Sequence, residues 1–145
     1  MFHIDYLFEI GSTAYGKTAA SILSGIVGIV ILVVFLNMLV SPVDSVSFLP
    51  FIVAFNAAAT GYMVIDKTRS CFRFKRSVAV FAGAMTTIVG CACLNYLSLQ
   101  ITGLFFISPA ELLSMLIVGC IAGWLGGALA IKYLNLQREN QSVKL

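Results

Sequence analysis

Residues 18–40 read TAASILSGIVGIVILVVFLNMLV, an apolar stretch that contains no ionisable side chain. As a helix rising about 1.5 Å per residue, this stretch would span about 34 Å, which is enough to cross a hydrocarbon core of about 30 Å. It is longer than the apolar core of a typical signal peptide, and no A-x-A-like cleavage site follows it. The stretch therefore predicts a retained transmembrane helix.

Three further apolar stretches, at residues 48–65, 77–99 and 109–131, follow with short polar connections between them. In the whole chain 60 % of the residues are hydrophobic and only 10 % are charged, whereas a soluble domain carries about 25 % charged residues. Lipid is the natural solvent for such a composition. We therefore predict an all-α protein, with residues 1–145 forming one integral membrane domain built as a four-helix transmembrane bundle.

Local signals mark the helix boundaries. The sequence SPAE at residues 108–111 predicts a capping box, because Ser caps the fourth span, Pro suits its first position and Glu reaches back to the cap. Pro50 is expected in the first turn of the second span, where proline is tolerated. Ahead of the first span, residues 2–10 fit either a short interfacial helix or a frayed terminus.

The basic residues predict the orientation, because cytoplasmic loops carry an excess of Lys and Arg. All nine lie before the first span, between the second and third spans, or after the fourth span. They are Lys17; Lys67, Arg69, Arg73, Lys75 and Arg76; and Lys132, Arg138 and Lys144. This alternation fits an even number of crossings with both termini in the cytoplasm, and we expect a cell membrane, in particular a bacterial inner membrane.

Small residues on the fourth span predict close helix packing. Gly119, Gly123 and Gly127 recur every four residues, and Ala122 and Gly126 form a parallel ridge beside them. Small side chains let helix backbones approach, which matters in lipid because apolar side chains gain little there by moving against each other. Packing within one subunit is the favoured interpretation, and an interface with a second copy is the alternative.

Uncharged polar residues lie near the middle of two spans, Asn56 and Thr60 in the second and Thr86 and Thr87 in the third. An amide in hydrocarbon needs a hydrogen-bond partner, so we expect Asn56 to face the interior and to bond either to the third span or to a backbone carbonyl. Interhelical hydrogen bonding is the favoured role of these residues. A ligand pocket is the functional alternative.

The connection between the second and third spans carries five basic residues. They are Lys67, Arg69, Arg73, Lys75 and Arg76. Such a loop sets the topology, and it can also bind anionic lipid headgroups or a phosphorylated ligand. Because it lies between two spans, the membrane surface is its expected neighbour and nucleic acid is not an expected partner.

The sequence offers no catalytic, cofactor or metal site. The one histidine, His3, has no cysteine or second histidine nearby, which excludes haem ligation by two histidines and disfavours a zinc site. No acid or base lies at membrane depth, where transporters and proton pumps keep ionisable groups. We therefore expect a protein that is not an enzyme and that binds no cofactor.

One part of the chain resembles a known family. Residues 49–59, LPFIVAFNAAA, are followed by an apolar turn, a basic loop and a third span. This order resembles the N-terminal multi-pass membrane-sensor segments of bacterial histidine kinases and diguanylate cyclases, in which an Asn-Thr-Ala helix start follows a Pro-containing stretch. Residues 108–113, SPAELL, look like a second copy of that start. Ala57 replaces the Thr after Asn56 and no output domain follows Leu145, so the resemblance implies a stand-alone membrane module that senses a signal or docks to a partner.

Three functions fit these observations. The leading hypothesis is a non-enzymatic protein of the lipid bilayer that acts through helix–helix contacts with a membrane-protein partner or with itself. The second is an immunity or exclusion protein that protects the inner membrane from a toxin, a phage or a conjugation apparatus. The third, ranked last, is a small pore or solute carrier lined by the uncharged polar residues, since selective pores are usually assembled from several subunits.

Overall fold

The computed structural model describes residues 14–40, 42–68 and 75–142, with side chains described at 15–40, 44–68 and 75–135. Regular structure in these ranges consists of helices. They are α2 (Ala14–Leu39), α3 (Pro42–Lys67), α4 (Lys75–Thr102) and α5 (Pro109–Ser142). All four are long and apolar enough to cross a membrane, which confirms the prediction of an all-α chain with four such helices. Residues 2–10, predicted as an interfacial helix or a frayed terminus, lie outside the described residues.

The helices extend beyond the apolar stretches that predicted them. α3 already begins at Pro42 and holds Pro50 in its interior, so the expectation that Pro50 lies in the first turn is wrong. Pro42 takes the first position instead, where the missing N–H costs no intrahelical hydrogen bond. Inside the helix, Pro50 cannot donate to the carbonyl of Val46. α5 continues past residue 131 to Ser142, which makes it the longest of the four.

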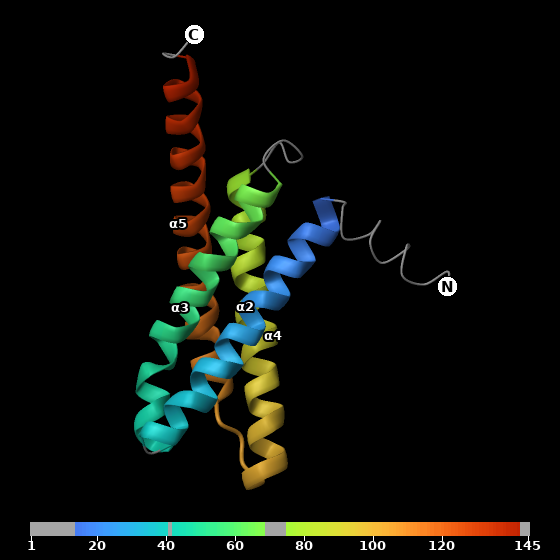
Figure 1. Ribbon diagram of the computed structural model, residues 1–145. Helices are drawn as coiled ribbons and strands as arrows, with labels where there is room; N and C mark the ends of the chain where they lie inside the picture. The colour runs from blue at the N-terminus through green and yellow to red at the C-terminus, as the bar shows by residue number, and fades with distance from the viewer. Residues whose placement is uncertain (1–13, 41, 69–74, 143–145) are drawn as a thin grey trace, which may run out of the picture.

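The four helices pack together and alternate in direction (Figure 1). The start of α2, the end of α3, the start of α4 and the end of α5 lie at one end of the molecule, and α5 extends past the others there (Figure 1). α3 and α4 contact each other, and each of them also contacts α2 and α5. α2 makes no contact with α5 among the described residues. α2 is also the least buried helix, with 22 % of its most apolar stretch buried against 44 % for α3 and α4.

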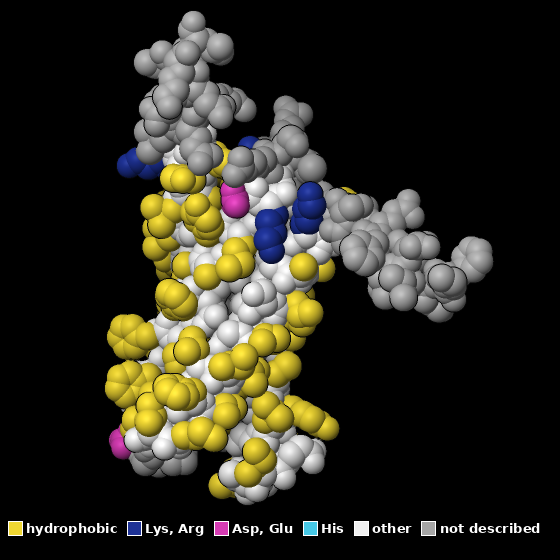
Figure 2. All heavy atoms as spheres, viewed as in Figure 1, with side chains coloured by type: hydrophobic (Ala, Val, Ile, Leu, Met, Phe, Trp, Pro, Cys, Tyr) yellow, Lys and Arg dark blue, Asp and Glu magenta, His cyan; other side chains and the backbone are white. Residues whose placement is uncertain are grey.

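The outer surface is apolar along most of its length. In Figure 2 hydrophobic side chains cover the visible face, and Lys and Arg side chains gather near one end of it. Large apolar side chains are exposed on every helix, among them Ile31, Phe51, Phe81 and Ile121. An apolar surface of this extent is suited to lipid and not to water. Together with the four apolar helices, it indicates a small membrane protein.

Glycines bring α5 into backbone contact with two helices. A β-carbon on Gly123 would stand 2.7 Å from the Ala79 carbonyl oxygen of α4 and 3.0 Å from the Gly83 α-carbon. On the neighbouring face, a β-carbon on Gly126 would overlap the Ala58 carbonyl oxygen of α3. α5 therefore presents one glycine face to α4 and a second to α3, and both faces pack within the chain.

The connection between α4 and α5 is fastened by Asn95 of α4. Its Nδ2 donates to the Ile107 carbonyl oxygen at 3.1 Å, and its Oδ1 accepts from the Ile107 N–H at 2.7 Å. Ile107 is buried, so these bonds satisfy backbone groups that water does not reach. The predicted capping box follows directly and is confirmed. Ser108 N–H donates to Glu111 Oε2 at 2.8 Å, and Glu111 N–H donates to Ser108 Oγ at 3.3 Å.

The glycine contact of α5 can be tested by adding one methyl group. Gly123→Ala is expected to lower the free energy of unfolding by about 1–3 kcal/mol, because the new β-carbon forces the backbones of α4 and α5 apart. Leu129→Ala on the exposed face of the same helix is the control and should change it by less than about 0.5 kcal/mol. Unfolding in mixed detergent micelles measures both values. Equal stability of Gly123→Ala and the parent would contradict the backbone contact.

Candidate functional site

Three of the four polar residues predicted at membrane depth meet where α2 crosses α3 and α4. Asn56 and Thr60 of α3 and Thr86 of α4 are 6 %, 1 % and 0 % exposed. A β-carbon on Gly25 of α2 would overlap the Thr60 hydroxyl and stand 2.8 Å from the Thr86 γ-carbon. A β-carbon on Gly28 would overlap the Asn56 side-chain oxygen. These five residues are termed the polar junction below.

The fourth polar residue, Thr87, belongs to a different contact. It is fully buried, and its hydroxyl lies where a β-carbon on Gly119 of α5 would be. Successive residues of a helix point about 100° apart, so Thr86 is directed to α2 while Thr87 is directed to α5. The four residues therefore do not form one group, although the sequence places them at similar depth.

Most of these polar groups bond to their own helix. Asn56 Nδ2 donates to the Ile52 carbonyl oxygen at 2.9 Å, and the Thr60 hydroxyl donates to the Asn56 carbonyl oxygen at 2.8 Å. The Thr87 hydroxyl donates to the Gly83 carbonyl oxygen at 2.9 Å. Of the two partners expected for Asn56, the structure has the backbone carbonyl. Gly25 and Gly28 of α2 lie against Thr60 and Asn56, whose donors are satisfied within α3, so α2 packs against these two residues by shape.

Thr86 is the exception within the polar junction. Its hydroxyl oxygen is buried and has no hydrogen-bond partner among the described residues. A buried donor that is left unpaired costs about 1–3 kcal/mol. Its methyl group, in contrast, packs against the position of Gly25. Thr86 therefore contributes to the junction through its shape and volume, while its hydroxyl weakens the fold.

The polar junction is closed by packing. Neither Gly25 nor Gly28 has room for one additional carbon atom, because side chains from α3 and α4 already occupy that space. The same holds at Gly119, opposite Thr87. A path for a solute needs open space beside the polar groups that line it. This arrangement weighs against a pore along the uncharged polar residues.

The basic residues of the second connection are only partly described. Lys67 and Arg76 are exposed and Lys75 is half-buried, whereas Arg69 and Arg73 lie outside the described residues. Lys17 and Lys132 are exposed as well, at the start of α2 and near the end of α5. The five described residues therefore belong to one end of the molecule, termed the basic end, where Figure 2 shows the blue side chains. Positive charge at this position is suited to anionic lipid headgroups.

The small residues singled out on α5 all point into the chain. All five of these residues are buried in the described structure. They are Gly119, Gly123, Gly127, Ala122 and Gly126. Sequence reasoning found these positions but not their partners, which are the backbones of α3 and α4 and the side chains of Thr87 and Ala79. This surface is consequently occupied and is not open to a second protein.

Comparison with known proteins identifies no relative of this chain. No protein-family model matches it, and no curated protein or solved structure matches it significantly. Among the described residues, no three His, Cys, Asp or Glu side chains lie close enough to hold a metal ion. The function is therefore argued from the packing and from the surfaces that the helices leave uncovered.

Two neighbouring threonines provide a matched test of the hydrogen bonds. Thr86→Val is expected to leave the free energy of unfolding unchanged or to raise it by up to about 1 kcal/mol, because it removes an unpaired hydroxyl and keeps the side-chain shape. Thr87→Val is expected to lower it by about 0.5–1.5 kcal/mol, because it removes a paired one. Unfolding in mixed micelles compares the two variants. A larger loss for Thr86→Val would show that the Thr86 hydroxyl is bonded after all.

Proposed function

We propose that this chain is a small, non-enzymatic protein of a cell membrane that acts by contacting another membrane protein through α2. In this proposal the four helices form a transmembrane bundle with both termini in the cytoplasm. The observation that carries this proposal is the difference in burial between α2 and α5. The small residues of α5 are buried inside the chain, whereas α2 is the least buried helix and keeps small residues on its outside.

The orientation is supported by the charges at the basic end. Lys17, Lys67, Lys75, Arg76 and Lys132 belong to helix ends that lie together, although they come from three separate parts of the sequence. The side of a membrane protein with the excess of Lys and Arg is normally cytoplasmic. A bacterial inner membrane suits this arrangement, and it places the α2–α3 and α4–α5 connections on the opposite side.

The contact surface is proposed on the part of α2 that faces away from the polar junction. Ala20 and Ser24 are exposed there, one helical turn apart, and Leu23 beside them is 61 % exposed. Two small residues at this spacing let a partner helix approach the backbone closely, and an exposed hydroxyl can bond across the interface. These three residues are termed the α2 outer face. A membrane-protein partner is favoured. A second copy of the chain in its place would be recognised by the mass of the crosslinked product.

The orientation can be measured with reporter fusions. A fluorescent protein that folds only in the cytoplasm is expected to be active when fused after Lys67 or after Leu145, and inactive after Thr102. Alkaline phosphatase, which is active only outside the cytoplasm, should give the opposite pattern. The reason is that the first two positions follow an even number of crossings and the third follows an odd number. Phosphatase activity after Lys67 would contradict the orientation.

The contact surface can be tested by photo-crosslinking in cells. A photoreactive amino acid at Leu23 is expected to give a discrete adduct with another membrane protein, because the α2 outer face lies against a partner helix. Leu129 of α5 is the matched control, since it is also a leucine and is 62 % exposed against 61 % for Leu23. Gel electrophoresis and mass spectrometry identify the adducts. Absence of an adduct at Leu23, or equal adducts at both positions, would remove the proposed contact.

A further inference from the structure

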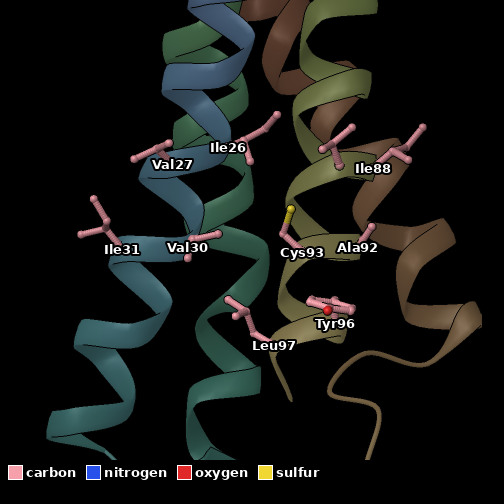
Figure 3. A pocket seen from close by; sticks show the side chains of 10 residues that line it. Ile26, Val27, Val30, Ile31, Ile88, Ala92, Cys93, Tyr96 and Leu97 are labelled. Atoms are coloured by element: carbon pink, nitrogen blue, oxygen red, sulfur yellow. The ribbon is translucent and has the colours of Figure 1, made fainter. Parts of the chain in front are cut away.

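A groove separates α2 from α4 along half of the length of α2. Its larger part is a hollow of ≈ 630 Å³ that opens to the side of the molecule, termed the deeper hollow because it lies nearer the middle of the helices. Figure 3 shows Ile26 and Val30 of α2 on one wall and Cys93 and Leu97 of α4 on the other. A second hollow of ≈ 360 Å³ shares Leu97 and continues away from the basic end. The two hollows together are termed the α2–α4 groove.

The polarity of the groove changes along its length. The deeper hollow is lined almost wholly by apolar atoms. The second hollow adds three polar side chains, which are Asn37 of α2 and Ser98 and Thr102 of α4. Asn37 Oδ1 accepts a hydrogen bond from the Ser45 hydroxyl at 2.6 Å, so the Nδ2 group is the part of this amide that can donate to a bound molecule. The Ser98 and Thr102 hydroxyls donate to the Leu104 and Ser98 carbonyl oxygens. The groove thus has an apolar inner part and an outer end at which Asn37 Nδ2 is the donor for a bound molecule.

The length of the groove matches one leaflet of a bilayer. Ile26 lies at the middle of α2, and Asn37 lies close to its end at Leu39. The eleven residue-to-residue steps from Ile26 to Asn37 correspond to about 17 Å of helix, about half of a hydrocarbon core of about 30 Å. The polar end of the groove therefore reaches the depth of lipid headgroups while its apolar part ends at the bilayer centre.

We propose that the α2–α4 groove binds one acyl chain of a phospholipid from the leaflet opposite the basic end. The chain lies along Val30, Cys93 and Leu97, and the ester and phosphate region of the same lipid lies at Asn37. Both hollows fall within the volumes of about 300–1,000 Å³ that are usual for small-molecule sites lined by apolar residues with a few polar groups. This inference rests on the proposed transmembrane bundle but not on the proposed protein contact, which it goes beyond.

The polarity favours a lipid over a helix of a partner or of a second copy. A transmembrane helix would present apolar residues of its own to the polar outer end, unless it carried a matching polar group. A phospholipid has the same change from polar to apolar, in the same direction and over the same depth.

The test uses the purified full chain in phosphatidylcholine vesicles. The probe is a phosphatidylcholine with a diazirine near the end of one acyl chain, and mass spectrometry maps the adducts after irradiation. The adducts are expected to concentrate on Ile26, Val30 and Cys93, because the chain end lies in the deeper hollow. Even labelling of these residues and of Ile117 and Ile121, which are exposed on α5, would mean contact with bulk lipid only and would overturn the proposal.

A matched pair of variants makes the test specific. Ala92 lines the deeper hollow and Ala19 lies outside both the groove and the α2 outer face, and both are exposed, so a larger side chain is compatible with the fold at either position. Ala92→Phe is expected to reduce groove labelling by on the order of ten-fold, and Ala19→Phe should leave it unchanged. Circular dichroism verifies that both variants are folded. Unchanged labelling in Ala92→Phe, or chain-to-chain adducts at the groove, would refute a lipid occupant.

Discussion

Apolar helices in lipid gain little from covering one another, so their attraction depends on how closely their backbones approach. In this protein that approach is set by glycines at the contacts of α3, α4 and α5. A β-carbon on Gly61 would overlap the Gly123 carbonyl oxygen, and a β-carbon on Gly83 would stand 2.5 Å from the Gly119 carbonyl oxygen. The contact of these three helices fixes where α3 and α4 present their polar side chains, and α2 packs on the surface that results.

α2 is joined to the other helices in a different way. Its glycines cover the side chains of Asn56, Thr60 and Thr86, whereas Gly123 and Gly126 of α5 meet the backbones of α4 and α3. The polar groups of α3 already bond within their own helix, so shape complementarity accounts for the fit of Gly25 and Gly28. Ile29 and Val33 of α2 also pack in a buried cluster with residues of α3 and α4, yet α2 remains the least buried helix. It leaves the α2–α4 groove on one side and the α2 outer face exposed.

Much of the fold could be predicted from the sequence, because its determinants are local. The four apolar stretches predicted four helices of sufficient length, and the capping box at Ser108 and Glu111 predicted the start of α5. The start of α3 was less accessible, because Pro42 and Pro50 both suit a first turn and the polar residues between them obscured the choice. The small residues of α5 lie buried against α3 and α4, whereas the sequence could not say whether their partner was inside the chain.

The candidate site was less predictable, because it depends on which helices are neighbours. Hydropathy and spacing located Asn56, Thr60, Thr86 and Thr87 at membrane depth, but they did not separate the first three from Thr87. The roles of Gly25 and Gly28 follow only from the crossing of α2 over α3 and α4. The two hydrogen bonds of Asn95 to Ile107 likewise need the path of the connection, which no sequence period encodes.

The backbone contacts of α5 also impose an order on assembly. α5 follows the other three helices in the chain, so Gly61 and Gly83 are synthesised before Gly123. At a synthesis rate of about 5–20 residues per second, the 40 residues after Thr102 up to Ser142 take about 2–8 s to add. During that interval Gly61 and Gly83 lack the α5 backbone that covers them in the finished protein. A ribosome that stalls before Pro109 would leave a fragment of three helices without the backbone contacts of α5. Quality-control proteases would then act on that incomplete fragment.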